Sequence, residues 1–271
     1  MVRLCDNLSM IIAQLSDTHV LERDEQNFVD NNASLASIVA SLNAEAPRPD
    51  LVLATGDLTN WGYPGQYEML AELLDDLEIP LLPLMGNHDD RTLTRKTFPD
   101  VPWVDADHAS WVTTTGDVTL VGLDSTDPDT HGAVFDKERQ LWLESCLAAA
   151  DGPVILTLHH PPFTTGVDWM DSSGFAGLAA LRRVIAENST KILRILCGHF
   201  HRPVVTTVEG VTTSVCLAGT YHVALDLRPA ADRSIIRDPR GYQLHLLDGA
   251  SVVTHTRYVD TGEVAFDPGW T

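Results

Sequence analysis

Five short polar segments constrain what this chain can fold into more strongly than any other feature of its sequence. Each segment places Asp, Asn or His directly after an apolar run that is typical of a buried strand. In open α/β sheets, binding sites form outside the carboxyl ends of the strands. We therefore expect the five segments to converge on one place. They are Asp17-Thr18-His19, Gly56-Asp57, Gly86-Asn87-His88-Asp89, His159-His160 and Gly198-His199-Phe200-His201.

The pattern between these segments predicts an α/β protein with a mixed sheet. Short apolar runs alternate with longer segments whose apolar residues recur at helical spacing, and strand-like runs joined by turns follow residue 203. The expected strands cover residues 10–15, 50–54, 81–85, 119–123, 154–158, 192–196, 204–208, 212–217, 242–247 and 252–258. The expected helices cover residues 29–42, 67–77, 136–149 and 175–187, and they are numerous enough to cover two sheet faces.

The chain shows no linker that would mark a domain boundary, so we expect a single domain over residues 1–271. Its core would span about residues 10–217, and the C-terminal strands, with a candidate oligomer arm, would span about residues 218–271. A stretch rich in Arg, Asp and Pro, from about residue 224 to 241, is interpreted as a loop or an arm. Met10 stands at the start of the first strand, so residues 1–9 are expected to be a dispensable extension.

The charge balance argues against a nucleic-acid polymer as a partner. The formal net charge is −20, because 18 Lys and Arg face 38 Asp and Glu. Proteins that bind nucleic acids need a basic surface. A small anion can still bind an acidic protein where metal ions supply a local positive charge.

The hydropathy and cysteine patterns predict a cytoplasmic protein that does not span a membrane. No window approaches 18 uninterrupted apolar residues, and Asp6 and Asn7 interrupt the first apolar stretch, which argues against a signal peptide. The four cysteines form no CxxC pair, and we expect them to be reduced, buried thiols. They are Cys5, Cys146, Cys197 and Cys216.

The polar segments together offer the ligands of a two-metal site. Residues i and i+2 of a strand point the same way, so Asp17 would face one point with His19, and His199 with His201. Mixed nitrogen and oxygen ligands favour Zn, Fe, Mn or Co over Ca or Mg. Seven side chains fill two sites of four ligands only if one of them bridges, and a carboxylate can do so. The candidate ligands are Asp17, His19, Asp57, Asn87, His159, His199 and His201, with Asp57 as the bridge.

Each segment taken alone also has an ordinary interpretation. Asp-x-His occurs by chance, Gly-Asp is a common turn, and a His before Pro-Pro can be a core residue at a strand end. Independent accidents at five strand ends are improbable, which favours the joint interpretation. Neither a GxSxG elbow nor a phosphate-binding GxxxxGK[ST] loop is present. The remaining histidines are interpreted as ordinary surface or sheet residues, namely His108, His131, His245 and His255.

The ordered set of segments resembles the calcineurin-like metallophosphoesterases. Their motif string is D-x-H, G-D, G-N-H-[DE], H and G-H-x-H, and every block occurs here between Asp17 and His201. The resemblance implies a four-layer α/β/β/α sandwich of two mixed sheets. It also implies one metal site formed by Asp17, His19, Asp57 and His201. The second site would be formed by Asp57, Asn87, His159 and His199.

The resemblance further implies that His88 is not a ligand but contacts the substrate phosphate and protonates the leaving group. Asp89 or Asp90 would orient His88. The segment Gly56-Asp57-Leu58-Thr59-Asn60-Trp61-Gly62 departs from the Gly-Asp-x-Val-Asp-Arg-Gly of the protein phosphatases in this family. The chain is more similar to the bacterial class III cyclic nucleotide phosphodiesterases and to glycerophosphodiesterases. Gly219-Thr220-Tyr221-His222 resembles a segment of the latter, which would place His222 near the substrate phosphate.

The sequence thus predicts a hydrolase that cleaves a small phosphodiester, a cyclic nucleotide or a glycerophosphodiester, by attack of a metal-bound hydroxide. Two transition-metal ions, each Fe, Mn, Zn or Co, would be its cofactors. A phosphomonoesterase or nucleotidase on the same site remains an alternative, as does a binding module without catalysis. Residues 160–177 would form a flap over the metals, and residues 223–241 a second wall or an oligomer arm. Because relatives often assemble, we expect a homo-oligomer.

Overall fold

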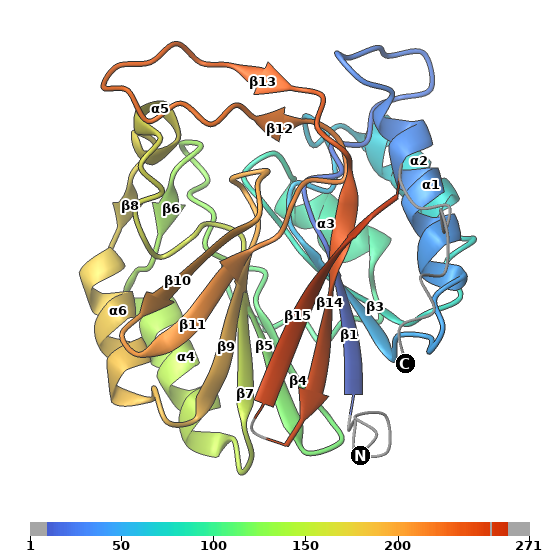
Figure 1. Cartoon of the computed structure of the whole chain (residues 1–271). Helices are drawn as coiled ribbons and strands as arrows, with labels where there is room; N and C mark the ends of the chain where they lie inside the picture. Colours follow the sequence, from blue (N-terminus) through green and yellow to red (C-terminus); the bar gives the residue numbers. More distant parts are fainter. Residues whose placement is uncertain (1–9, 250, 260–271) are drawn as a thin grey trace, which may run out of the picture.

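The computed structural model describes residues 10–249 and 251–259. The predicted dispensable extension over residues 1–9, which includes Cys5, lies outside the described residues. In the described part, the long strands form two sheets that lie back to back between two groups of helices (Figure 1). No helix in these residues is long and apolar enough to cross a membrane.

The first sheet has the strand order β15-β14-β1-β2-β3. The strands β1, β2 and β3 run parallel, whereas β14 pairs antiparallel with β1 and β15 pairs antiparallel with β14. The strands β14 and β15 therefore extend the sheet that β1 starts. The bounds are β1 Met10–Leu15, β2 Leu51–Thr55, β3 Leu81–Leu84, β14 Gly241–Asp248 and β15 Ser251–Tyr258.

The second sheet has the order β10-β11-β9-β7-β5-β4, with antiparallel strands at both edges and parallel strands between them. Its bounds are β4 Trp111–Thr115, β5 Val118–Leu123, β7 Val154–Leu158, β9 Ile192–Cys197, β10 Val204–Val208 and β11 Val211–Val215. Two short strand pairs lie outside the sheets. They are β6 Ala133–Val134 with β8 Phe175–Ala176, and β12 His222–Val223 with β13 Ile235–Ile236.

Helices cover the outer face of each sheet (Figure 1). The first sheet is covered by α1 Asn31–Asn43, α2 Pro64–Leu74 and α3 Arg91–Thr97. The second sheet is covered by α4 Lys137–Ala149 and α6 Leu178–Glu187, while the short α5 Asp168–Asp171 lies below the β12–β13 arm.

Three apolar clusters fill the three spaces between these layers, because alternate residues of a strand point to opposite faces. On β1, Ile12 packs between the sheets, while Ala13 and Leu15 pack toward α1 and α2. On β7, Ile155 packs between the sheets, while Leu156 and Leu158 pack toward α4 and α6. The predicted α/β/β/α sandwich of two mixed sheets is thereby confirmed.

Some elements differ from the sequence-based expectation. The predicted helix over residues 175–187 begins only at Leu178, because Gly177 has a left-handed φ of 79° and the residues before it form β8. The sequence pattern missed β4, an edge strand with alternating exposure, and α3, which has only seven residues. Of the segment from residue 224 to 241, residues 224–234 form an arm whose base is closed by the β12–β13 pair, and Gly241 already begins β14.

Candidate metal centre

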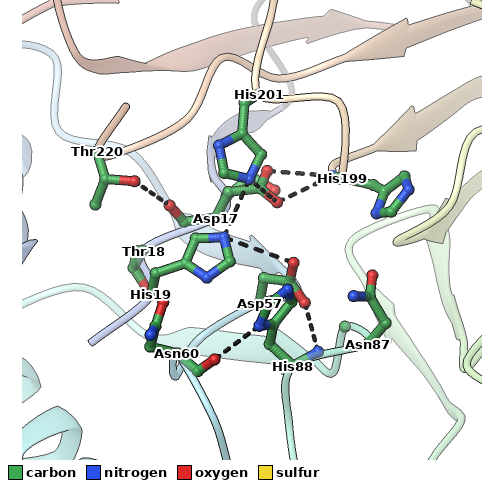
Figure 2. Close-up of polar contacts among 12 residues, drawn as sticks. Asp17, Thr18, His19, Asp57, Asn60, Asn87, His88, His199, His201 and Thr220 are labelled. Atoms are coloured by element: carbon green, nitrogen blue, oxygen red, sulfur yellow. Dashed lines mark hydrogen bonds and ion pairs between the residues drawn. The ribbon is translucent and has the colours of Figure 1, made fainter. Parts of the chain in front are cut away.

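The five polar segments follow the carboxyl ends of β1, β2, β3, β7 and β9. Figure 2 shows residues of four of them gathered in one place. Backbone hydrogen bonds tie neighbouring segments to one another. The amide of Asp17 donates to the carbonyl of Gly56 at 3.0 Å, and the amide of Gly198 donates to the carbonyl of His159 at 3.0 Å. These bonds fix the loops relative to one another before any side chain contributes.

Five of the candidate ligands have left-handed backbone conformations, with φ of 54° at Asp17, 42° at His19, 50° at Asp57, 70° at His199 and 53° at His201. The segments converge at the carboxyl ends of strands, as expected, but strand alternation, the expected reason why Asp17 would face one point with His19, and His199 with His201, is wrong. These residues follow the strands in tight turns that aim the side chains inward. A non-glycine residue in such a conformation costs on the order of 1 to 3 kcal/mol, and this strain is typical of functional sites.

The first group of donors consists of Asp17, His19, Asp57 and His201. All four are buried, and one donor atom from each lies within 4.8 Å of the others. His19 Nε2 lies 3.6 Å from Asp57 Oδ2, and His201 Nε2 lies 3.4 Å from Asp17 Oδ1. The two imidazole Nε2 atoms are only 3.0 Å apart. These are the residues that the motifs assigned to one metal ion.

The second group lies on the other side of Asp57. His159 Nε2 lies 3.4 Å from Asp57 Oδ2 and 3.2 Å from Asn87 Oδ1. The ring of His199 lies 5.2 Å from that of His159. One oxygen of Asp57 thus faces an imidazole from each group, which is the position that a bridging carboxylate requires.

The hydrogen bonds behind the imidazoles suit metal binding. The Nδ1 atom of His159 lies 2.8 Å from the carbonyl oxygen of Thr55, and that of His201 lies 2.9 Å from the carbonyl oxygen of Tyr221. A carbonyl can only accept, so each Nδ1 carries a proton, and in the neutral, metal-binding form of each ring Nε2 turns a lone pair inward. These lone pairs face the oxygens of Asp57, Asn87 and Asp17. Lone pairs of nitrogen and oxygen that point at one another repel unless a cation lies between them. This set of side chains therefore suits two divalent ions.

The pKa shifts of Asp57, His19 and His199 suit metal ions. Burial alone would oppose ionisation of Asp57, but the nearby His159 and His88 hold the pKa of its carboxyl well below the usual range. Burial lowers the pKa of His19 and of His199 well below the ordinary value, so both rings stay neutral. Two ligands shift the other way: burial raises the pKa of Asp17, and the Asp57 carboxylate, against the effect of burial, raises the pKa of His159 to about 9. Carboxylates and neutral imidazoles are the forms that bind metals, so metal binding would displace a proton from His159.

His88 lies at the edge of the centre and is held by the backbone. Its Nδ1 donates to the carbonyl oxygen of Asn60 at 2.7 Å, and its amide donates to Asp57 Oδ1 at 2.9 Å. The expectation that Asp89 or Asp90 orients the ring is wrong. Asp89 accepts backbone amides of Gly86, Leu58 and Thr59, while Asp90 caps the N-terminus of α3.

The Gly-Thr-Tyr-His segment reaches the centre through its tyrosine. The ring of Tyr221 stacks on His19 with 5.6 Å between centroids and lies 4.9 Å from the ring of His201. His222 is buried in β12, and its Nε2 has no hydrogen-bond partner in the described part of the chain. Sequence patterns did not single out Tyr221 as a contact of the ligands.

Two further histidines contact the predicted ligands. Asn87 Nδ2 lies 3.2 Å from His131 Nδ1, so a residue interpreted as an ordinary surface histidine contacts the centre. The buried ring of His160 lies 4.6 Å from that of His199, and its Nε2 has no partner among the described residues. No motif surrounds His131 in the sequence, whereas His160 stands beside a candidate ligand and could have been suspected.

The geometry of this centre agrees with comparisons to known proteins. The sequence profile of the calcineurin-like phosphoesterases matches residues 10–203. The chain belongs to the calcineurin-like phosphoesterase family. The matched region contains all seven candidate ligands and His88. This metallophosphoesterase therefore carries two groups of adjacent donors that form a candidate binuclear metal site. One group is Asp17, His19, Asp57 and His201, and the other is His159, His160 and His199.

The metallophosphoesterase has curated relatives over nearly its whole length. It is 31% identical over 256 residues to a probable glycerophosphodiester phosphodiesterase of Arcobacter nitrofigilis, covering 92% of this chain and 93% of the relative. It is 32% identical over 238 residues to a cAMP/cGMP dual specificity phosphodiesterase of Mycobacterium tuberculosis, covering 84% and 72%.

A solved structure supports the fold of this phosphoesterase. A purple acid phosphatase from yellow lupin superposes with a TM-score of 0.68 at 16% identity, covering 94% of this chain and 52% of the lupin chain. The chain thus spans about half the length of that phosphatase.

Proposed function

We propose that this metallophosphoesterase is a binuclear-metal phosphodiesterase that hydrolyses small phosphodiesters, either cyclic nucleotides or glycerophosphodiesters. The observation that carries the proposal is the position of Asp57. One buried oxygen of its carboxylate lies 3.6 Å from an imidazole of the first donor group and 3.4 Å from an imidazole of the second. Two adjacent cations sharing a carboxylate suit in-line displacement at phosphorus.

The ligand sets that we propose follow the family motifs, and the first set coincides with one group of adjacent donors. One ion would be held by Asp17, His19, Asp57 and His201, and the other by Asp57, Asn87, His159 and His199. When bound, the ions polarise the phosphoryl oxygens and lower the pKa of water toward about 7. Fe, Mn, Zn and Co all accept such mixed nitrogen and oxygen ligands.

In this proposal, His88 is the general acid that protonates the departing alkoxide. The carbonyl of Asn60 keeps the proton on Nδ1, so Nε2 is the atom available to the substrate. A protonated His88 hydrogen-bonds the phosphate and gives the Nε2 proton to the alkoxide as the P–O bond breaks. The amide of Asn87 and the side chain of His222 are proposed to contact the phosphate as well.

The preference for diesters rests on the relatives. Those at about 31% identity are named as glycerophosphodiester and cyclic nucleotide phosphodiesterases. The donor groups themselves do not separate diesters from monoesters. Purified protein reconstituted separately with Fe, Mn, Zn and Co is therefore assayed with bis(p-nitrophenyl) phosphate and p-nitrophenyl phosphate. We expect faster turnover of the diester, and faster turnover of the monoester would instead make the protein a phosphomonoesterase.

We also propose that the chain works in the cytoplasm as a homo-oligomer. The β12–β13 arm exposes apolar side chains, with 59% of Leu225 and 63% of Leu227 accessible to solvent. Light scattering of the purified protein measures the assembly. A monomer at micromolar concentration would contradict this part of the proposal.

A further inference from the structure

The indole ring of Trp61 lies beside His88, at the edge of the metal centre. The ring of Trp61 lies 5.8 Å from the ring of His88, at an interplanar angle of 46°. More than half of the Trp61 side chain, 54%, is exposed. A large aromatic surface is thus left open next to the group that would meet the departing alcohol.

The loop that carries this indole is held firmly. The amide of Trp61 donates to Gln66 Oε1 at 2.8 Å. Gly62 has a φ of 71°, and a Cβ at that position would lie 3.3 Å from the carbonyl oxygen of His88. The backbone carbonyl of Asn60, the residue before Trp61, accepts a hydrogen bond from Nδ1 of His88. The same loop therefore orients the imidazole and carries the indole beside it.

This arrangement favours one kind of alcohol. A planar ring attached to the alcohol can stack on the face of an indole, whereas a glycerol unit has no π-face to offer. We propose that Trp61 is a specificity-determining residue that selects phosphodiesters in which the alcohol carries a planar heterocycle or aromatic ring, such as a nucleoside. The inference rests on the proposed phosphodiesterase function, and it favours the cyclic nucleotide over the glycerophosphodiester.

Tyr63 provides a matched control. It is an aromatic residue two positions away with the same exposure of 54%, and it lies at the start of α2. Within the described residues, its ring contacts none of the histidines of the centre. Replacing Tyr63 therefore removes an exposed aromatic ring but leaves the ring beside His88 in place.

The experiment compares Trp61→Ala, Trp61→Phe and Tyr63→Ala with the wild type, using 3′,5′-cAMP and glycerophosphoethanolamine as substrates. We expect Trp61→Ala to raise KM for cAMP about 5- to 150-fold, the range of base–aromatic stacking, while kcat changes less than about twofold. KM for glycerophosphoethanolamine should stay constant, Trp61→Phe should recover most of the loss, and Tyr63→Ala should change neither substrate.

Three results would overturn the inference. They are an equal rise of KM for both substrates, no change for either, or loss of bound metal in Trp61→Ala as measured by elemental analysis. A wild-type enzyme that hydrolyses neither diester would contradict the proposed function instead. In that case the inference is tested with the corresponding monoesters, AMP and glycerol 3-phosphate. Trp61→Ala must then weaken turnover of AMP and leave turnover of glycerol 3-phosphate unchanged.

Discussion

Asp57 is the residue on which both donor groups depend. We expect Asp57→Asn to weaken metal binding at both positions by at least about 100-fold, because the bridging charge is lost. Elemental analysis after dialysis would then find far less than two ions per chain. Retention of both ions would disprove the bridging role. Asp30→Asn, a substitution at the exposed cap of α1, controls for the loss of one carboxylate outside the centre.

His88 should separate catalysis from metal binding. We expect His88→Ala to lower kcat by about 10² to 10⁴, the usual contribution of a general acid, while both metal ions remain bound. Its contacts through Nδ1 and the backbone amide do not involve the Nε2 atoms of the ligands. Unchanged kcat in a fully metal-loaded variant would remove His88 from the mechanism.

His131 illustrates a residue whose role depends on a hydrogen bond behind a ligand. Asn87 Nδ2 donates to His131 Nδ1, which leaves Asn87 Oδ1 turned toward His159 and the second donor group. We expect His131→Ala to weaken the second ion about 10- to 100-fold without affecting the first, as measured by titration with Co²⁺. The exposed His255 offers a control, and equal weakening after His255→Ala would contradict the prediction.

At the level of elements, a substitution at the N-terminus of α3 should change the stability of the protein but not its catalysis. The side chain of Asp90 accepts the amide of Leu93 at 2.8 Å and so caps this helix. We expect Asp90→Ala to lower the free energy of unfolding by about 1 kcal/mol and to leave kcat and metal content unchanged. Urea unfolding and a standard assay measure the two effects. A large loss of kcat would show that Asp90 acts on His88 after all.

The segments at the strand ends show which features of the metal centre could be predicted from the sequence. The residue types at the ends of β1, β2, β3, β7 and β9 were visible as motifs, because each needs only a few neighbours in sequence. Their left-handed conformations, and the carbonyls behind the imidazoles, were not visible. Thr55 and His159, for example, are 104 residues apart and meet only when β2 and β7 lie in facing sheets.

In the whole molecule, polar groups join the C-terminal strands and the second sheet to β1. His245 on β14 contacts Gln14 Oε1 at 3.0 Å and Thr254 Oγ1 at 2.9 Å, and Gln14 Nε2 donates to the carbonyl of Cys197 on β9. Burial lowers the pKa of His245 to about 3. The ring therefore stays neutral in the folded protein at pH values where an unfolded histidine takes up a proton.

This difference predicts how stability depends on pH. Between about pH 6.5 and pH 3 the unfolded chain binds one proton more at His245, so the free energy of unfolding falls as the pH is lowered. From pH 6.5 to pH 5 the loss from this residue would be about 2 kcal/mol, at about 1.4 kcal/mol per pH unit. Urea unfolding should show a shallower pH dependence for His245→Gln, and the same slope as the wild type for His255→Gln. Parallel slopes for all three proteins would contradict the assignment.

The sequence by itself determined the α/β class, the family with the sandwich that it implies, and the donor types at the strand ends, because hydrophobic periodicity and short motifs depend on residues close together in the chain. Only the tertiary structure decided that Asn60 rather than a carboxylate orients His88, and that Tyr221, His131 and Trp61 surround the centre. It also decided that β14 pairs with β1. These contacts join segments far apart in sequence, and packing of the two sheets and their loops, rather than local pattern, brings such segments together.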